Sequence, residues 1–288
     1  MQIIDYHTHS TNSPDGTNTV EELVLSAIDK KVKEIAITDH YEPPFFATSN
    51  VDKYVYREAL AQNPGYGKMD TDSYSYDRNK FFAEINAVRE KYGDKIRIKA
   101  GVELGNPESH DIFHSNFLTE DYDFVIGSIH RIDNDFEIDD GHYTAQNYNE
   151  VFERYFYYSM EMAKWGKFNV CGHCMYPVRF VIYRDKVPNV DLCVYYPYLR
   201  EMFKLLMEKG IGIEINTAGI KKGFFLPDIN ILRLYKKLGG EILTIGSDAH
   251  MAKDIGRGFY EALDMVRDAG FKYLTVFDRQ KPEFVRID

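Results

Sequence analysis

Six short apolar runs in this chain end in a histidine, an aspartate or a glutamate, and this repeated ending constrains the fold more than any other feature. In a barrel of parallel strands, the C-terminal ends of the strands meet at one face, where their side chains can build a shared site. One such ending is common by chance, but six together indicate a ring of strands around a polynuclear metal site. The endings are Asp5-Tyr6-His7-Thr8-His9, Thr38-Asp39-His40, Gly101-Val102-Glu103, Ser128-Ile129-His130, Cys171-Gly172-His173 and Ser247-Asp248-Ala249-His250.

Strand-like and helix-like segments alternate along almost the whole chain. Apolar residues at helical spacing predict helices at residues 19–31, 76–92, 147–165, 198–209, 228–238 and 258–269. Short apolar runs predict strands at residues 2–6, 34–38, 95–102, 124–128, 169–172, 212–216 and 241–246. Repeated strand–helix units are typical of parallel strands, and no linker or low-complexity segment interrupts them. We therefore predict one α/β domain over residues 1–288, with the irregular segment 41–76 as a candidate lid or substrate loop.

Length and charge limit the functions that this chain can have. Its 288 residues suffice for one α/β barrel, which commonly needs about 250. A net charge of −10 argues against a nucleic-acid surface, although metals and local cations can still attract a small anionic substrate. The sequence shows no leader pattern and no apolar stretch of about 18 residues, which predicts a cytoplasmic protein without a membrane partner. The oligomeric state is left open.

The spacing of the ligand candidates allows them to converge. Side chains two residues apart on a strand point to the same face, so His7 and His9 can both reach the mouth of a barrel. Asp248 and His250 repeat this spacing, and Glu103 offers a carboxylate that can bridge two cations. A single histidine is more often packed or exposed than a ligand, so the interpretation depends on the joint occurrence. Imidazole and carboxylate together favour two or three divalent transition-metal ions, namely Zn²⁺, Mn²⁺ or Fe²⁺/Fe³⁺.

The ordered motifs, together with the Ser13-Pro14-Asp15-Gly16 turn, resemble those of the polymerase and histidinol phosphatase (PHP) family from residue 3 to about residue 270. The resemblance implies a distorted (β/α)7 TIM-like barrel with a trinuclear metal site at the C-terminal ends of the strands. It also implies three ligand sets. The first holds His7, His9, Glu103 and Asp248, the second Glu103, His130 and His173, and the third Asp15, His40 and His250.

Within that family the chain is most similar to the stand-alone histidinol-phosphate phosphatases. The similarity lies in Gly172-His173 followed by Pro177-Val178-Arg179, and in the segment Glu214-Ile215-Asn216-Thr217-Ala218-Gly219. Arg179 is the best phosphate clamp, because a guanidinium can donate two parallel hydrogen bonds to phosphate oxygens. After the second segment such phosphatases often carry an arginine, whereas this chain has Lys221 and Lys222, which can act only as point charges.

We therefore expect a histidinol-phosphatase of histidine biosynthesis that acts on a small phosphorylated substrate. In the expected reaction a metal-bridging hydroxide attacks phosphorus, with Glu103, Asp248 and Arg179 as the catalytic residues and Lys221 and Lys222 as further substrate contacts. Two alternatives remain. One is another phosphoesterase of the family that acts on nucleotides or nucleic-acid ends, which a basic groove would support. The other is a non-catalytic metal-binding module, which should have lost several of the ligands.

Overall fold

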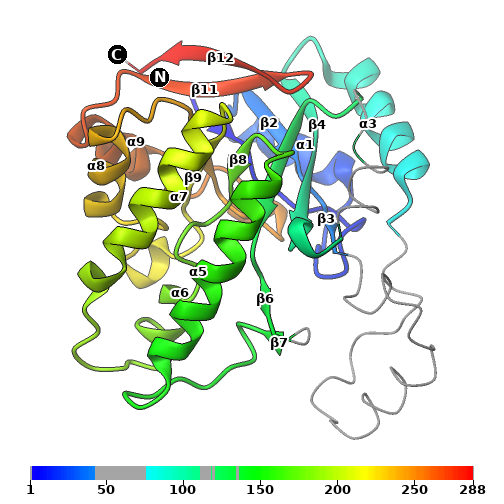
Figure 1. The fold of residues 1–288 in the computed structure, drawn as a ribbon. Helices are drawn as coiled ribbons and strands as arrows, with labels where there is room; N and C mark the ends of the chain where they lie inside the picture. The colour runs from blue at the N-terminus through cyan, green and yellow to red at the C-terminus, as the bar shows by residue number, and fades with distance from the viewer. Residues whose placement is uncertain (1, 43–75, 111–117, 119–120, 134–135, 288) are drawn as a thin grey trace, which may run out of the picture.

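The computed structural model describes residues 2–42, 76–110, 118, 121–133 and 136–287. Most of the candidate lid or substrate loop at residues 41–76 lies outside these described residues. The described part begins with a strand and alternates strands with helices up to a C-terminal hairpin (Figure 1).

A parallel sheet forms the centre of the described structure. Its strands follow the order β1 (Ile4–Asp5), β2 (Glu34–Ile37), β4 (Arg97–Gly105), β5 (Phe124–Ser128), β8 (Val170–Cys171), β9 (Gly212–Asn216) and β10 (Leu243–Gly246). The Tyr6 amide donates to the Ile245 carbonyl at 3.0 Å, and a parallel bridge joins Thr8 to Ala249, so the last strand returns to the first. Within the described residues these seven strands make a nearly closed barrel, which confirms the predicted (β/α)7 fold.

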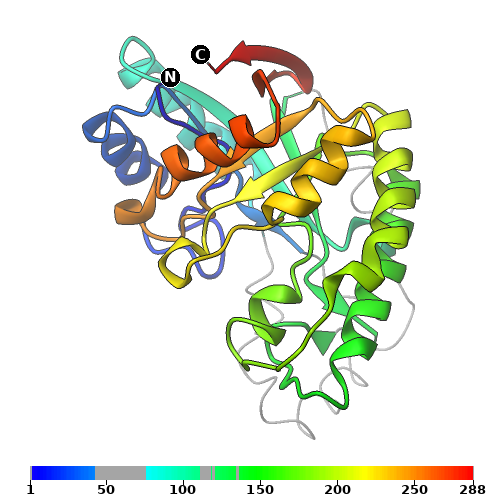
Figure 2. The same cartoon turned by 90° about the vertical axis from the view of Figure 1, so that its left-hand side faces the viewer.

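Helices cover the outside of this sheet, as the two views in Figures 1 and 2 show. The longer ones are α1 (Val20–Asp29), α3 (Arg78–Tyr92), α5 (Tyr148–Trp165), α7 (Tyr196–Glu208), α8 (Ile229–Lys237) and α9 (Phe259–Asp268). Each buries one apolar face; in α1 this face is Val20, Leu23, Val24 and Ala27. Their polar faces remain toward solvent, as expected for amphipathic helices around a barrel.

Local sequence signals fix the ends of several helices. The Thr19 side chain accepts from the Glu22 amide while the Glu22 carboxylate accepts from the Thr19 amide, which is a capping box at the start of α1. Asp77 and Asp228 cap α3 and α8 in a similar way. Gly166, at φ 65°, ends α5 in the left-handed conformation that glycine adopts without strain.

The smaller elements are short and lie in the connections. They are β3 (His40–Tyr41), which pairs with β4, the hairpin β6 (Arg131–Ile132) and β7 (Phe136–Glu137), helix α6 (Val178–Val181) and the 3₁₀ turns Pro107–His110, Leu192–Tyr195, Ile220–Lys222 and Ala252–Asp254. The sequence does not predict β3, β6 or β7 as strands, because these pairs of residues do not lie in apolar runs like those that contain β1 and β8.

A C-terminal hairpin of β11 (Tyr273–Asp278) and β12 (Lys281–Arg286) lies across the N-terminal ends of the barrel strands (Figure 1). The Phe277 amide donates to the Tyr6 hydroxyl at 2.8 Å, and the Gln280 amide donates to the Asp123 carbonyl at 2.8 Å. The elements predicted from the sequence end at residue 269 and do not include this hairpin. Its turn residues Arg279 and Gln280 have φ values of 47° and 62°, a conformation that sequences usually mark with glycine or asparagine.

Candidate metal centre

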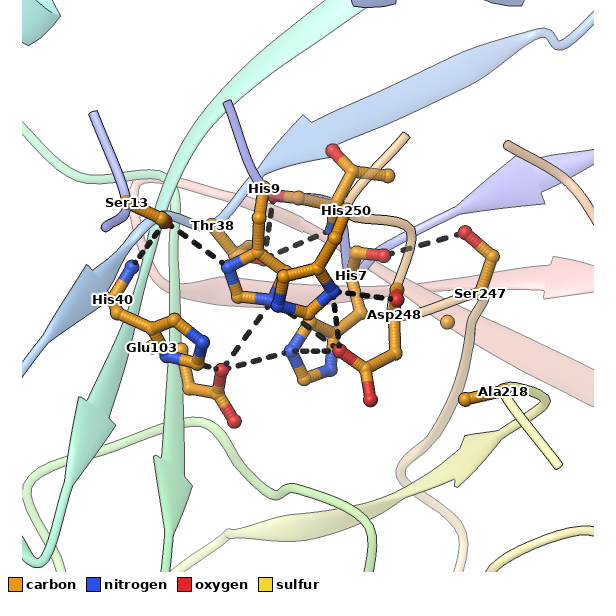
Figure 3. Close-up of polar contacts among 12 residues, drawn as sticks. His7, His9, Ser13, Thr38, His40, Glu103, Ala218, Ser247, Asp248 and His250 are labelled. Carbon is orange, nitrogen blue, oxygen red and sulfur yellow. Dashed lines mark hydrogen bonds and ion pairs between the residues drawn. The ribbon is translucent and has the colours of Figure 1, made fainter. Parts of the chain in front are cut away.

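The side chains that follow the barrel strands converge at the C-terminal end of the barrel (Figure 3). His7 and His9 follow β1, Glu103 lies in β4, and Asp248 and His250 follow β10. Parallel strands bring their carboxyl ends to one face, so residues far apart in sequence meet there. The other predicted ligands in this region are Asp15, His40, His130 and His173.

Three overlapping groups of these residues have ligand atoms close enough to hold an ion. Within each group the atoms lie within 4.8 Å of one another. The groups are His7, His9 and Asp248; His9, His40 and His250; and His40, Glu103 and His130. Because the groups share His9 and His40, the geometry indicates one continuous cluster rather than separate sites.

Glu103 lies at the centre of this cluster and is fully buried. Its Oε2 atom is 3.0 Å from His7 Nε2 and 3.0 Å from His40 Nδ1, and its Oε1 atom is 3.0 Å from His173 Nε2. The Ser128 hydroxyl donates to Oε1 at 2.6 Å. Both carboxylate oxygens thus face imidazoles from different strands, as a bridging ligand requires.

Asp248 and Asp15 bring carboxylates to the other side of the cluster. Asp248 Oδ1 is 3.4 Å from His9 Nε2 and 3.6 Å from His250 Nδ1. Asp248 itself has φ 53°, a strained conformation for a non-glycine residue, of a kind that often occurs at functional sites. Asp15 Oδ2 is 2.9 Å from His250 Nε2 and 3.6 Å from His40 Nε2, and its side chain is half exposed.

Burial and neighbouring charges shift the pKa values of the cluster in different directions. Burial raises the pKa of Glu103, but His7 and His40 outweigh it and hold that pKa well below its usual range. The pKa of His9 falls to about 3, because burial disfavours its charged form and His250 and His40 lie close by. His9 therefore stays neutral, with a lone pair available for a metal.

Unpaired nitrogen atoms supply a second observation that fits a metal. Among the described residues, His9 Nε2, His40 Nδ1 and His173 Nδ1 are buried and make no contact with hydrogen-bond geometry, even though His40 Nδ1 lies 3.0 Å from Glu103 Oε2. His9 Nε2 lies 3.5 Å from Glu103 Oε2 and 3.4 Å from Asp248 Oδ1 without hydrogen-bond geometry to either. Buried polar atoms are rarely left unsatisfied. Nitrogen and oxygen donors in this arrangement suit zinc, manganese or iron.

Two further carboxylates hold the loops that carry the ligands. Asp39 accepts from the Ser10 amide at 2.5 Å and from the Ser13 hydroxyl at 2.9 Å, and Ser13 Oγ accepts from the His40 amide at 2.9 Å. Asp5 accepts from the Ser247 amide at 2.8 Å. The sequence patterns do not predict these roles for Asp5 and Asp39. The signal that could have identified them is an aspartate within or directly after an apolar run that is predicted to be a strand.

Arg179 reaches the cluster, whereas the structure does not bring Lys221 and Lys222 to it. Arg179 donates through one terminal nitrogen to Asn216 Oδ1 and to Asp248 Oδ2, both at 3.2 Å. Its Nε atom is buried and has no partner among the described residues. Lys221 is exposed and pairs with Asp254 at 3.1 Å, and Lys222 is exposed.

Comparison with known proteins gives a consistent result. Residues 5–218 match the sequence model of the PHP domain. A histidinol-phosphatase from Lactococcus lactis is 30% identical over 98% of this chain and 96% of its own length. The crystal structure of the histidinol phosphate phosphatase from Lactococcus lactis, complexed with zinc, L-histidinol and phosphate, superimposes with a TM-score of 0.76 at 26% identity, covering 98% of this chain and 99% of that one. No helix in the described part of the chain is long and apolar enough to cross a membrane.

Proposed function

Because the chain belongs to the PHP domain family, we propose that it is a metal-dependent phosphomonoesterase that hydrolyses histidinol phosphate to histidinol and phosphate. The observation that carries this proposal is the cluster around Glu103, whose donor atoms come from the ends of most barrel strands. The relative in which zinc, L-histidinol and phosphate are bound matches this chain over nearly its full length, which supports the same substrate.

The proposed cofactor is two or three divalent transition-metal ions. We assign His7, His9, Glu103 and Asp248 to the first ion and Glu103, His130 and His173 to the second. Asp15, His40 and His250 would hold the third. The overlapping groups of ligand atoms contain seven of these nine residues, and the other two, Asp15 and His173, contact His250 at 2.9 Å and Glu103 at 3.0 Å. When bound, such ions act as Lewis acids and lower the pKa of a coordinated water, which makes it a nucleophile at neutral pH.

The chain's own residues would bind the phosphate and offset its charge. Among the described residues the Nε donor of Arg179 has no partner, and one terminal nitrogen is shared between Asn216 and Asp248, so its guanidinium can turn two donors toward phosphate oxygens. Its guanidinium carbon lies 5.1 Å from the centre of the Tyr176 ring, which limits its movement. A fixed cation at this position would stabilise the negative charge that grows in the transition state.

We propose that residues 1–288 form one domain, that the protein is cytoplasmic, and that its substrate is a small molecule rather than a nucleic acid. The net charge of −10 supports the choice of substrate. Cys171, Cys174 and Cys193 are free thiols, which is consistent with a reducing compartment.

Steady-state kinetics on a panel of phosphate esters tests the proposal. The panel contains histidinol phosphate, a nucleoside monophosphate, glycerol phosphate and an oligonucleotide with a terminal phosphate, each assayed with Zn²⁺ or Mn²⁺ supplied. We expect the highest kcat/KM for histidinol phosphate, loss of activity after chelation and recovery on metal addition. A higher kcat/KM for the nucleotide or the oligonucleotide would refute the substrate assignment. Elemental analysis should find two or three transition-metal ions per chain.

A further inference from the structure

Glu214 is a buried carboxylate outside the proposed ligand set that contacts two of its histidines. It lies in the middle of β9, and its side chain is 1% exposed. Oε1 is 2.6 Å from His7 Nδ1, and Oε2 accepts from the backbone amide of His173 at 2.7 Å. Both oxygens thereby face nitrogen atoms, and Glu214 belongs to none of the three groups of candidate ligand atoms found among the described residues.

The contact with His7 determines which nitrogen of that ring faces the cluster. A carboxylate beside Nδ1 holds the proton on that atom, which leaves the lone pair on Nε2. His7 Nε2 points toward the centre of the site, 3.0 Å from Glu103 Oε2 and 3.8 Å from Asp248 Oδ1. Glu214 therefore fixes both the tautomer and the ring orientation that a metal ligand needs.

The contact with His173 restrains a second ligand through its backbone. His173 has φ 21°, a conformation that residues with a side chain seldom adopt and that costs energy unless the surroundings hold it. The hydrogen bond from its amide to Glu214 provides such a restraint. In this conformation the His173 ring reaches Glu103 Oε1 through Nε2 at 3.0 Å.

Gly246 in the neighbouring strand β10 leaves the space in which Glu214 and His7 meet. A Cβ atom at Gly246 would lie 2.3 Å from Glu214 Oε1 and 2.3 Å from the Cβ of His7. Both distances are far inside van der Waals contact. A side chain at this position would therefore have to separate the two residues, and the close approach of β1, β9 and β10 depends on a glycine here.

We propose that Glu214 is a positioning residue that orients His7 and His173 for metal binding and so sets the metal affinity of the site. This inference rests on the proposed function only in assuming that the cluster binds transition metals. Partners of this kind, which hydrogen-bond a ligand without touching the ion, typically change metal affinity by about 10–100-fold when they are removed.

Competition with a chromophoric chelator tests the proposal on the full-length, zinc-loaded protein. In Glu214→Gln the amide keeps the shape of the side chain but can accept at only one position, so one of the two contacts is lost. Glu34→Gln is the matched control. Glu34 is also a barrel-strand glutamate whose side chain is 1% exposed, but it is bonded to Tyr6 and Arg97, away from the cluster. Circular dichroism and thermal unfolding of the metal-free proteins monitor the fold.

We expect Glu214→Gln to weaken zinc binding by about 10–100-fold, while Glu34→Gln stays within about threefold of the wild type. Wild-type zinc affinity in Glu214→Gln, or an equal loss in Glu34→Gln, would overturn the proposal. If the wild type prefers another phosphate ester, the substrate assignment fails, but the difference in zinc affinity between the two variants still supports the role of Glu214.

Gly246→Ala provides a second test in which the carboxylate and the histidine remain intact. Its Cβ should push Glu214 away from His7, and we expect weaker zinc binding of similar size in protein that remains folded. A folded Gly246→Ala with wild-type zinc affinity would contradict the proposal. This variant keeps the proposal open to refutation if Glu214→Gln does not fold, because wild-type zinc affinity here would overturn it.

Discussion

Two buried carboxylates at the N-terminal end of the barrel, Glu34 and Asp123, are each paired with an arginine, whereas Glu103 at the C-terminal end is surrounded by imidazoles. At the first end Glu34 pairs with Arg97 at 2.5 Å, and Asp123 pairs with Arg89 at 2.5 Å. At the second end the ion-pair partners of Glu103 within the described part of the chain are all histidines, and Asp248 contacts both His9 and Arg179. Because a buried charge is costly unless it is compensated, metal ions of the kind proposed above would offset the charge of Glu103.

The packing of the two ends also differs, because one end is filled by aromatic rings and the other by polar side chains. The N-terminal end contains the rings of Tyr6, Phe124 and Phe277, with centroids 4.9 Å apart for Tyr6 and Phe124 and 5.0 Å apart for Phe124 and Phe277. The β11–β12 hairpin covers this end, as Figure 1 shows. The C-terminal end contains polar side chains and the unpaired nitrogens described above. The comparison indicates that one end supplies stability and the other supplies chemistry, a division common in barrels.

Arg179→Met should give the largest loss of activity. If the guanidinium holds the phosphate through the transition state, kcat/KM for histidinol phosphate should fall by about 10²–10⁴-fold. Arg179→Lys should recover only part of this loss, because lysine keeps the charge without the fork. Metal content should stay unchanged in both variants. An unchanged kcat/KM in Arg179→Met would show that the phosphate is held by other groups.

Phe277→Ala should destabilise the fold strongly and leave the activity of the folded protein unchanged. Phe277 is 2% exposed and packs on Phe124 and Tyr6, so its loss should lower the free energy of unfolding by about 3–5 kcal/mol. Denaturant titration measures this change, and kinetics on the remaining folded protein should give the wild-type kcat/KM. A large fall in kcat/KM per folded molecule would break the division between the two ends.

Much of the fold and of the candidate site could be predicted from the sequence, because both depend on short-range patterns. Residues 124–128 and 212–216 are the strands that the apolar runs predict, and Thr19 with Glu22 marks the start of α1. The ligands follow apolar runs, and parallel strands bring such positions to one face whatever the loops between them do.

The missed features depend on contacts between distant segments. Glu214 lies between Ile213 and Ile215 in a strand. A charged residue that alternates with apolar residues in a predicted strand was the one local sign of its role. Its contacts with His7, 207 positions away, cannot be inferred from spacing. The β11–β12 hairpin was missed for a local reason, since Arg279 and Gln280 are not residues that usually form its turn.

Glu103→Gln and Asp248→Asn should each lower activity by about 10²-fold or more while the fold is retained. A neutral amide is a poor substitute for a charged oxygen that holds cations, and both residues are proposed ligands of the first ion. Circular dichroism should show wild-type secondary structure in both variants. Turnover near that of the wild type, in a variant with its full metal content, would contradict the proposed roles of these carboxylates.

Lys221→Met should have the smallest effect, and it sharpens the comparison by testing a cation outside the cluster. The Lys221 side chain is 68% exposed and pairs with Asp254 at 3.1 Å, whereas the Arg179 side chain is 21% exposed and contacts Asp248 directly. A solvated ammonium transmits little of its charge to a buried phosphate, because water and salt screen it. We therefore expect kcat/KM to change by less than about threefold, with most of the change in KM. The assay should be repeated at low and high salt, since a remote charge that acts only by attraction loses its effect when screened. A fall in kcat as large as that of Arg179→Met would mean that Lys221 leaves Asp254 and touches the phosphate during turnover.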